Sequence, residues 1–215
     1  MKASTSMNPL KTKADIHLLR KVFHFLGVVA IMAFYHNLPY QKAVILLSMI
    51  SIIVFALEAI RFKFPIVNKY AVMLMGPFMR SYEKNALTGT SYMLLGALIV
   101  IVVFPKIIAM LSFSFLAVAD PAASYFGVRF GKDKLIGNKS LQGATAAFVC
   151  CSIISIIYFL EQGLFTNRVL FVAILAGLIG SASELIKVKN LDDNLTLPVI
   201  SACSLWVLFT IFGGI

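Results

Sequence analysis

Seven mostly apolar stretches, each close to the length that a helix needs to cross a bilayer, follow one another along the chain. Hydrophobic residues make up 60% of the 215 positions, and the mean hydropathy is +0.92. A water-soluble core of ordinary composition could not bury so much apolar surface. We therefore predict an all-α integral membrane protein, a single domain over residues 1–215 that forms a compact bundle of about seven transmembrane helices. The predicted spans are Leu18–Tyr35, Ala43–Ile60, Thr88–Phe104, Ile107–Gly127, Leu141–Leu160, Val169–Ile186 and Leu197–Phe212.

One further apolar segment, Phe64–Tyr82, is interrupted by Lys69, Gly76 and Pro77. The interruptions favour an amphipathic helix that lies in the membrane interface over another crossing. An eighth crossing would also invert the orientation of every later span. Residues 1–15 are predicted to form a short cytoplasmic N-terminal tail.

Basic residues are distributed unevenly between the two predicted membrane faces. With the N-terminus in the cytoplasm, all of the 19 Lys and Arg residues except Lys42, Lys106 and Arg168 fall on the cytoplasmic side. All nine acidic residues except Glu161 lie at or near the same side. The net charge of +10 thus has a topological explanation, and no nucleic-acid partner is expected without a soluble domain. We predict a cytoplasmic site in a bacterial inner membrane or a eukaryotic endomembrane.

The segment DPAASYFGVRFGKDKLIGNKSLQG, Asp120–Gly143, places an acid inside a predicted span. Asp120, Ser124, Gly127 and Gly131 recur at helical spacing and share one face. A carboxylate at this depth costs a few kcal/mol, on the order of 2–3, unless a metal, a cation or a water-filled pocket accompanies it. Asp120 is therefore predicted to bind a metal or to pair with a basic side chain from another helix.

The loop after this span combines Gly with Lys and Arg, a composition suited to wrapping phosphate oxygens. It is not a Walker A sequence, and a basic loop can also act only as a topology determinant. Ser140 can cap the next helix. The candidate phosphate ligands are Gly127, Arg129, Gly131, Lys132, Lys139, Ser140 and Gly143.

Two further sets of charged residues lie near the predicted cytoplasmic ends of the first two spans. Arg20, Lys21 and His24 share a helix face and could bind a phosphate or extend to lipid headgroups. Glu58 and Arg61, three residues apart, are predicted to pair with each other.

Later spans supply polar candidates too. Thr88, Ser91 and Tyr92 could hold a lipid hydroxyl or form hydrogen bonds between helices, and Glu184 could be a metal ligand. Asp192, Asp193 and Asn194 offer hard oxygen donors for Mg²⁺, although the same residues could form a solvated turn and helix cap.

Four segments in this order resemble the CTP-dependent lipid kinase family of dolichol kinases, phytol kinases and yeast-type diacylglycerol kinase. They are RKVFH, EKNALTGTSYMLLG, DPAASYFGVRFGKDKLIGNKSLQG and SELIKVKNLDDNLTLP. The central segment is also distantly similar to CDP-diacylglycerol synthases, but the Lys-Arg and His-Gly-Gly signature of those enzymes is absent. Many kinases of the family have Glu where this chain has Gln142, which removes a carboxylate there.

The resemblance implies transfer of the γ-phosphate of a nucleoside triphosphate, usually CTP, to the hydroxyl of a membrane lipid, with Mg²⁺ as the metal. Catalytic roles carry over to Asp120, Glu184 and Asp193. Metal binding carries over to these three residues with Asp192 and Asn194, and nucleotide binding to the phosphate ligands above with Arg20, Lys21 and His24. We expect one carboxylate to accept the proton of the lipid hydroxyl.

Two other functions fit part of the pattern. A phosphatidate cytidylyltransferase would use the same donor and release pyrophosphate, and a small transporter would use Asp120 and Glu184 as relay groups. The outer halves of the spans are nearly all apolar, which disfavours the transporter. The sequence leaves open which alcohol is the acceptor, whether diacylglycerol, phytol or a polyprenol, whether CTP or ATP is the donor, and the oligomeric state.

Overall fold

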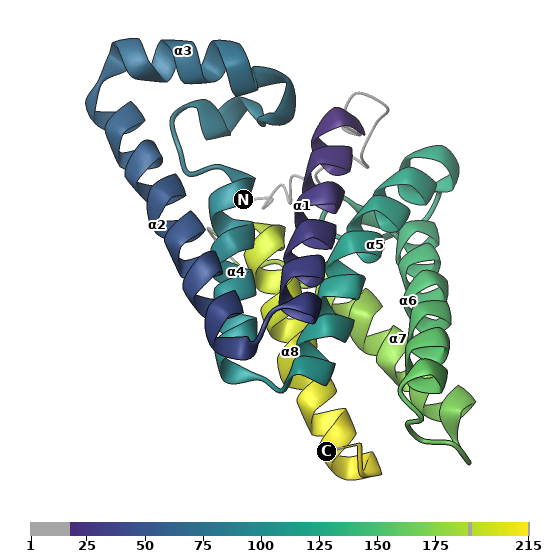
Figure 1. The fold of residues 1–215 in the computed structure, drawn as a ribbon. Helices are drawn as coiled ribbons and strands as arrows, with labels where there is room; N and C mark the ends of the chain where they lie inside the picture. The colour runs from purple at the N-terminus through teal and green to yellow at the C-terminus, as the bar shows by residue number, and fades with distance from the viewer. Residues whose placement is uncertain (1–17, 189–190, 215) are drawn as a thin grey trace, which may run out of the picture.

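A computed structural model describes residues 18–188 and 191–214 of the chain (Figure 1). This part of the chain forms eight α-helices, two short 3-10 helices and a two-stranded antiparallel hairpin. The elements are α1 (Leu18–Asn37), α2 (Tyr40–Lys63), α3 (Pro65–Met75), η2 (Gly76–Phe78), η3 (Ser81–Lys84), α4 (Gly89–Val103), α5 (Lys106–Phe130), β1 (Lys134–Ile136), β2 (Lys139–Ser140), α6 (Leu141–Glu161), α7 (Val169–Leu185) and α8 (Asp193–Phe212). The all-α prediction is confirmed, with the small hairpin as an addition. The tail predicted over residues 1–15 lies outside the described residues.

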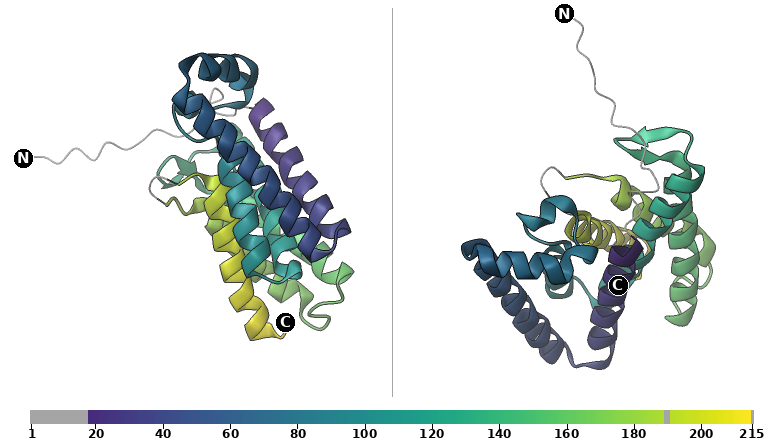
Figure 2. Two further views of the ribbon diagram at one scale, coloured as in Figure 1. Left: turned by 60° about the vertical axis from the view of Figure 1, so that its left-hand side comes forward. Right: turned by 90° about the horizontal axis from the view of Figure 1, so that it is seen from above.

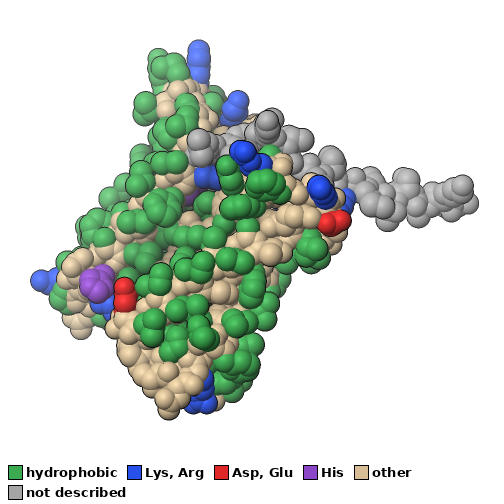
Figure 3. Space-filling model, turned by 90° about the vertical axis from the view of Figure 1, so that its right-hand side faces the viewer, with side chains coloured by type: hydrophobic (Ala, Val, Ile, Leu, Met, Phe, Trp, Pro, Cys, Tyr) green, Lys and Arg blue, Asp and Glu red, His purple; other side chains and the backbone are tan. Residues whose placement is uncertain are grey.

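Seven of these helices coincide with the seven predicted spans. Helices α1, α2, α5, α6 and α8 are long and apolar enough to cross a membrane, whereas α4 and α7 are apolar but have only 15 and 17 residues. Apolar side chains cover the face formed by α5, α6 and α7, and charged side chains gather toward its two ends (Figure 3). Such a surface suits lipid better than water. The chain is therefore a multi-pass membrane protein.

Helix α5 lies at the centre of the bundle, in contact with α1, α6 and α8. Its side chains Phe113 and Phe115 are fully buried, as are Phe159 of α6 and Phe209 of α8. Helices α6 and α7 pack with their backbones close together, because α7 carries small residues at the contact. A Cβ atom on Gly177 would collide with Ser152 of α6.

Helix α3 lies across the end of α2 and has no buried residue (Figures 1 and 2). It begins with Pro65, which is favourable at the first position of a helix because its missing N–H needs no partner there. Its 11 residues rise only about 16 Å, too little to cross the hydrocarbon core. The segment Phe64–Tyr82 therefore makes no further crossing, as predicted.

The buried side chain of Arg61 connects the end of α2 to the segment before α4. Its guanidinium donates to Oε2 of Glu58 at 2.6 and 2.8 Å, which confirms the predicted pairing. The same group donates to the backbone carbonyls of Glu83, Lys84 and Ala86. One cation thus satisfies several carbonyls of an irregular segment and holds the start of α4 in place.

The close approach of α6 and α7 gives a stability prediction. Gly177→Ala should lower the free energy of unfolding by about 1–3 kcal/mol, because the added methyl overpacks the contact with Ser152. Gly76→Ala is the matched control, since no atom lies within 4 Å of a Cβ there and the backbone is helical. Thermal unfolding in detergent measures both. Equal unfolding temperatures for the two variants would contradict this packing.

Candidate functional site

A polar pocket lies where α1, α5 and α8 meet the segment between α3 and α4. We name it the Asp120 pocket, and its polar lining is Arg20, Lys21, His24, Arg80, Asp120, Asp193 and Asn194. The structure thus brings the early basic motif together with predicted carboxylates from two other helices. Arg80 is an addition that the sequence did not single out.

Asp120 forms an ion pair across two helices. Nζ of Lys21 on α1 lies 2.8 Å from Oδ2 of Asp120 and also donates to the Asp120 backbone carbonyl at 3.2 Å. The cation expected beside an intramembrane carboxylate is therefore Lys21. The Asp120 side chain remains 31% exposed, so part of it still faces the pocket.

Asp192 forms the helix cap that the sequence allowed as the alternative to metal binding. Its Oδ2 lies 2.5 Å from Nη1 of Arg80, and its Oδ1 accepts the backbone N–H of Asn194 at 3.0 Å, which caps α8. Burial would lower the pKa of the Arg80 guanidinium, but Asp192 and Tyr82 outweigh burial and raise the pKa. With its carboxylate fully buried against Arg80, Asp192 acts as a helix cap and ion-pair partner. A metal-binding role for Asp192 stays a prediction.

Glu83 and Arg20 form the buried wall beside this pair. Nη2 of Arg20 lies 3.6 Å from Oε1 of Glu83, and Oε2 of Glu83 accepts the backbone N–H of Arg80 at 3.2 Å. Burial raises the pKa of the Glu83 carboxyl, and Arg20 opposes that shift. Within residues 18–188 and 191–214, Nε of Arg20 and Nδ1 of His24 are buried without a hydrogen-bond partner. Since buried polar atoms are normally satisfied, these two atoms are candidates for hydrogen bonds to a ligand in the adjoining pocket.

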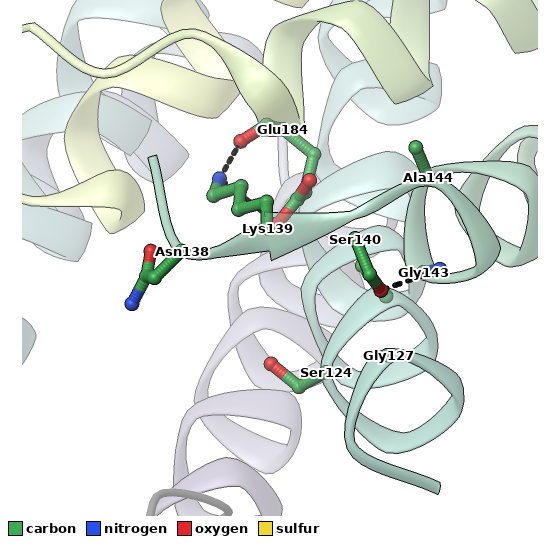
Figure 4. A pocket seen from close by; sticks show the side chains of 9 residues that line it. Ser124, Gly127, Asn138, Lys139, Ser140, Gly143, Ala144 and Glu184 are labelled. Carbon is green, nitrogen blue, oxygen red and sulfur yellow. Dashed lines mark hydrogen bonds and ion pairs between the residues drawn. The ribbon is translucent and has the colours of Figure 1, made fainter. Parts of the chain in front are cut away.

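A second pocket, the Lys139 pocket, lies where the hairpin meets α5, α6 and α7 (Figure 4). Gly137 turns the hairpin with a φ of 60°, which suits glycine. Nζ of Lys139 lies 2.9 Å from Oε1 of Glu184 and also donates to the Glu184 carbonyl. Ser140 accepts the backbone N–H of Gly143 and caps α6, as predicted.

The two pockets lie on successive turns of α5, because Asp120 lines one and Ser124 lines the other, roughly 6 Å further along the helix. The Lys139 pocket also has Gly127 and Gly143 in its lining. It has room for only about 10 Å³, close to one water molecule. Lys139 and Glu184, which pair with each other, both belong to its lining.

The carboxylates predicted to share a metal do not form one cluster. Among the described residues, no group of three or more His, Cys, Asp or Glu side chains is placed to hold a metal ion. Glu184 is buried against Lys139 in the second pocket, so it does not join Asp120 and Asp193, which line the first. Of the predicted ligands, the Asp120 pocket contains Asp120, Asp193 and Asn194.

The residues predicted to hold a lipid hydroxyl have other partners. Oε1 of Glu58 accepts from Thr88 at 2.8 Å and lies 3.4 Å from the hydroxyl of Ser91. These contacts join α2 to the start of α4, which is the alternative that the sequence allowed. Tyr92 is half-buried beside them.

Comparisons with known proteins identify the relatives of this chain. No protein-family model matches it, and no solved structure matches it. It is 37% identical over 164 residues to CTP-dependent diacylglycerol kinase 1 of Schizosaccharomyces pombe, covering 70% of this chain and 74% of that protein. The kinase of the same name from Saccharomyces cerevisiae is 29% identical over 203 residues, covering 85% and 70%. An uncharacterized Rickettsia prowazekii protein is 30% identical over 190 residues, covering 86% and 91%.

The chain belongs to the CTP-dependent lipid kinase family. The resemblance based on four short segments is thereby confirmed.

In this family member, the side chain of Gln142 forms hydrogen bonds with the loop after α5. Its side-chain oxygen lies 3.1 Å from the backbone N of Lys132 and 3.3 Å from that of Asp133, while its Nε2 donates to Asp133 at 2.7 Å. A neutral amide is suited to this position because it accepts from the backbone and donates to an acid.

Other predicted nucleotide ligands are distributed around the pockets. Arg129 in the last turn of α5 and Lys132 on the loop after it are exposed, whereas Lys139 and Ser140 are buried. Gly131 ends α5, and a Cβ atom there would meet Ser140. The glycines of the central motif therefore permit close packing of the hairpin against α5.

The Lys139–Glu184 ion pair gives a second prediction. Lys139→Met should destabilise the protein by about 3–5 kcal/mol, because it leaves the Glu184 carboxylate buried beside an apolar group. The double variant Lys139→Met with Glu184→Gln should recover most of this loss, and Lys132→Met, at an exposed cation, should have little effect. Thermal unfolding in detergent is the measurement. A Lys139→Met protein as stable as the unaltered one would show that the pair does not hold the fold together.

Proposed function

We propose that the chain transfers the γ-phosphate of CTP to the hydroxyl of diacylglycerol in the membrane. The yeast relatives are named for this donor and this acceptor. The observation that carries the proposal is the Asp120 pocket, where carboxylates and cations from α1, α5 and α8 converge at one end of a membrane-spanning bundle. A charged phosphate donor and a membrane alcohol can meet at such a boundary.

The N-terminus and the Asp120 pocket lie on the cytoplasmic side in this proposal. Its support is the asymmetry of the basic residues, which the positive-inside rule assigns to the cytoplasm. CTP would then reach the pocket directly from the cytoplasm. Two exposed cations, Arg129 at the end of α5 and Lys132 on the loop after it, would attract its phosphates.

The pocket fits Mg²⁺ bound together with a nucleotide. Mg²⁺ in such sites takes one or two protein carboxylates plus substrate phosphates, and the pocket offers Asp120 and Asp193 with the amide of Asn194. When bound, the ion would neutralise charge on the phosphate oxygens. Arg20 and Arg80 supply further positive charge from the pocket wall, where Asp192 keeps Arg80 oriented.

The chemistry needs positioning more than covalent catalysis, because phosphoryl transfer passes through a loose transition state. The lipid hydroxyl oxygen forms a bond to the γ-phosphorus, and the bond from that phosphorus to the bridging oxygen of CDP breaks. A carboxylate of the pocket, Asp120 or Asp193, takes the hydroxyl proton. The products are CDP and phosphatidate.

Labelled CTP tests this proposal. Purified protein in detergent with Mg²⁺ and dioleoylglycerol should incorporate label from γ-labelled CTP into phosphatidate and release CDP, whereas α-labelled CTP should leave the lipid unlabelled. ATP assayed in parallel measures the donor preference. With phosphatidate in place of dioleoylglycerol, label from the α-phosphate in a CDP-lipid, with pyrophosphate released, would instead identify a cytidylyltransferase.

Asp120→Asn should lower the rate of transfer by about 100-fold or more, the scale expected when one charge-stabilising group is removed from a site. Glu161→Gln is the matched control, because Glu161 is exposed and falls on the opposite membrane side in the proposed topology. Glu161→Gln should unfold near the temperature of the unaltered protein, and Asp120→Asn, which keeps a hydrogen-bonding amide beside Lys21, should remain folded. Full activity in a folded Asp120→Asn protein would remove Asp120 from the mechanism.

A further inference from the structure

An apolar groove runs between α1 and α2, with α4 as its floor. We name it the α1–α2 groove, and its volume is about 220 Å³. Apart from Thr90 and Tyr35, the lining residues are apolar. The lining residues on which the argument below depends are Phe23, Gly27, Ala30, Tyr35, Thr90 and Met93.

The shape of the groove follows from the directions of the two helices. α1 and α2 are joined by a short connection and diverge from it toward α3 (Figures 1 and 2). At the α3 end, the ring of Phe78 packs against Phe23 with a centroid distance of 5.2 Å. Along α1 the lining extends from Phe23 to Tyr35, roughly 18 Å at the helical rise. This length is close to one leaflet, half of the ~30 Å hydrocarbon core.

The groove adjoins the Asp120 pocket at the first turn of α4. A Cβ atom on Gly89 would lie 3.0 Å from Nη2 of Arg20, 3.0 Å from Cε1 of His24 and 2.8 Å from Nδ2 of Asn194, all of which line the pocket. The next residue, Thr90, lines the groove. A molecule with an apolar tail and a polar head could therefore occupy both spaces at once.

Polar atoms at this junction lack partners in the protein. Nε of Arg20 and Nδ1 of His24 have no hydrogen-bond partner among the described residues, and the Arg20 side chain is only 8% exposed. His24 follows Phe23 of the groove directly in the chain. Hydroxyl and ester oxygens of a lipid head would supply the missing partners.

We propose that the α1–α2 groove holds a hydrocarbon chain of the acceptor lipid and directs its hydroxyl past His24 and Arg20 into the Asp120 pocket. The identity of the acceptor, diacylglycerol, rests on the proposed function. The lipid enters sideways from the bilayer between α1 and α2, because Phe23 and Phe78 close the α3 end. Met93, whose side chain lies over Gly27, can adjust to chains of different shape because it is unbranched.

Filling the groove tests this assignment. Ala30 lines the groove and is exposed, roughly 9 Å along α1 from His24, so Ala30→Trp adds bulk there without overpacking the core. Val29→Trp is the matched control, because Val29 is 41% exposed and lies outside the groove lining. Ala30→Trp should lower phosphorylation of dioleoylglycerol by about tenfold relative to Val29→Trp, while the short acceptor dihexanoylglycerol is phosphorylated equally by both.

Photocrosslinking gives a readout that does not require catalysis. A diacylglycerol with a diazirine at the end of one chain should label residues of α1, α2 and α4 that line the groove in the unaltered protein and in Val29→Trp. Ala30→Trp should lose this labelling. Labelling confined to the outer faces of α6 and α7, or equal labelling and equal rates in both variants, would overturn the groove assignment. Groove labelling in a protein that phosphorylates neither acceptor would sustain the groove and refute the proposed kinase activity instead.

Discussion

Charged side chains inside a membrane-spanning bundle need partners, and this requirement organises one end of the molecule. Four buried or half-buried carboxylates there are each paired with a cation from a different element, since an unpaired charge at such depth is costly. The contacts tie α1 to α5 and η3, the segment before η3 to α8, and the hairpin to α7. The pairs are Lys21–Asp120, Arg20–Glu83, Arg80–Asp192 and Lys139–Glu184.

The pairs divide this end of the bundle into two pockets with different character. In the Lys139 pocket the pair is almost fully buried and the space is only about 10 Å³, so the pair mainly fixes the hairpin against α7. In the Asp120 pocket the Lys21–Asp120 pair is partly exposed, and Nε of Arg20 and Nδ1 of His24 have no hydrogen-bond partner among the described residues. That difference is why we place the reacting groups at Asp120 rather than at Lys139. The apolar groove that ends beside the same two residues is consistent with this choice.

The sequence predicted the membrane-spanning helices well, because hydropathy and helix length are local properties of the chain. Local pairs were predicted too, such as Glu58 with Arg61 and the cap formed by Ser140. Partners that are distant in the chain were not. Lys139 was expected to bind phosphate and Glu184 to bind a metal, and their contact across 45 positions has no signal in a single sequence. From the sequence, Arg80 contributed only to the predicted membrane orientation, because its ion-pair partner Asp192 lies 112 positions away.

The central claim is that nucleotide and lipid meet in the Asp120 pocket. Electron cryomicroscopy of the protein in lipid nanodiscs, with Mg²⁺, a non-hydrolysable CTP analogue and diacylglycerol, tests it most directly. We predict density for the terminal phosphate beside Asp120 and Arg80, with the lipid hydroxyl on the His24 side of the pocket. A nucleotide bound elsewhere, or a lipid head at the opposite end of the bundle, would contradict the account.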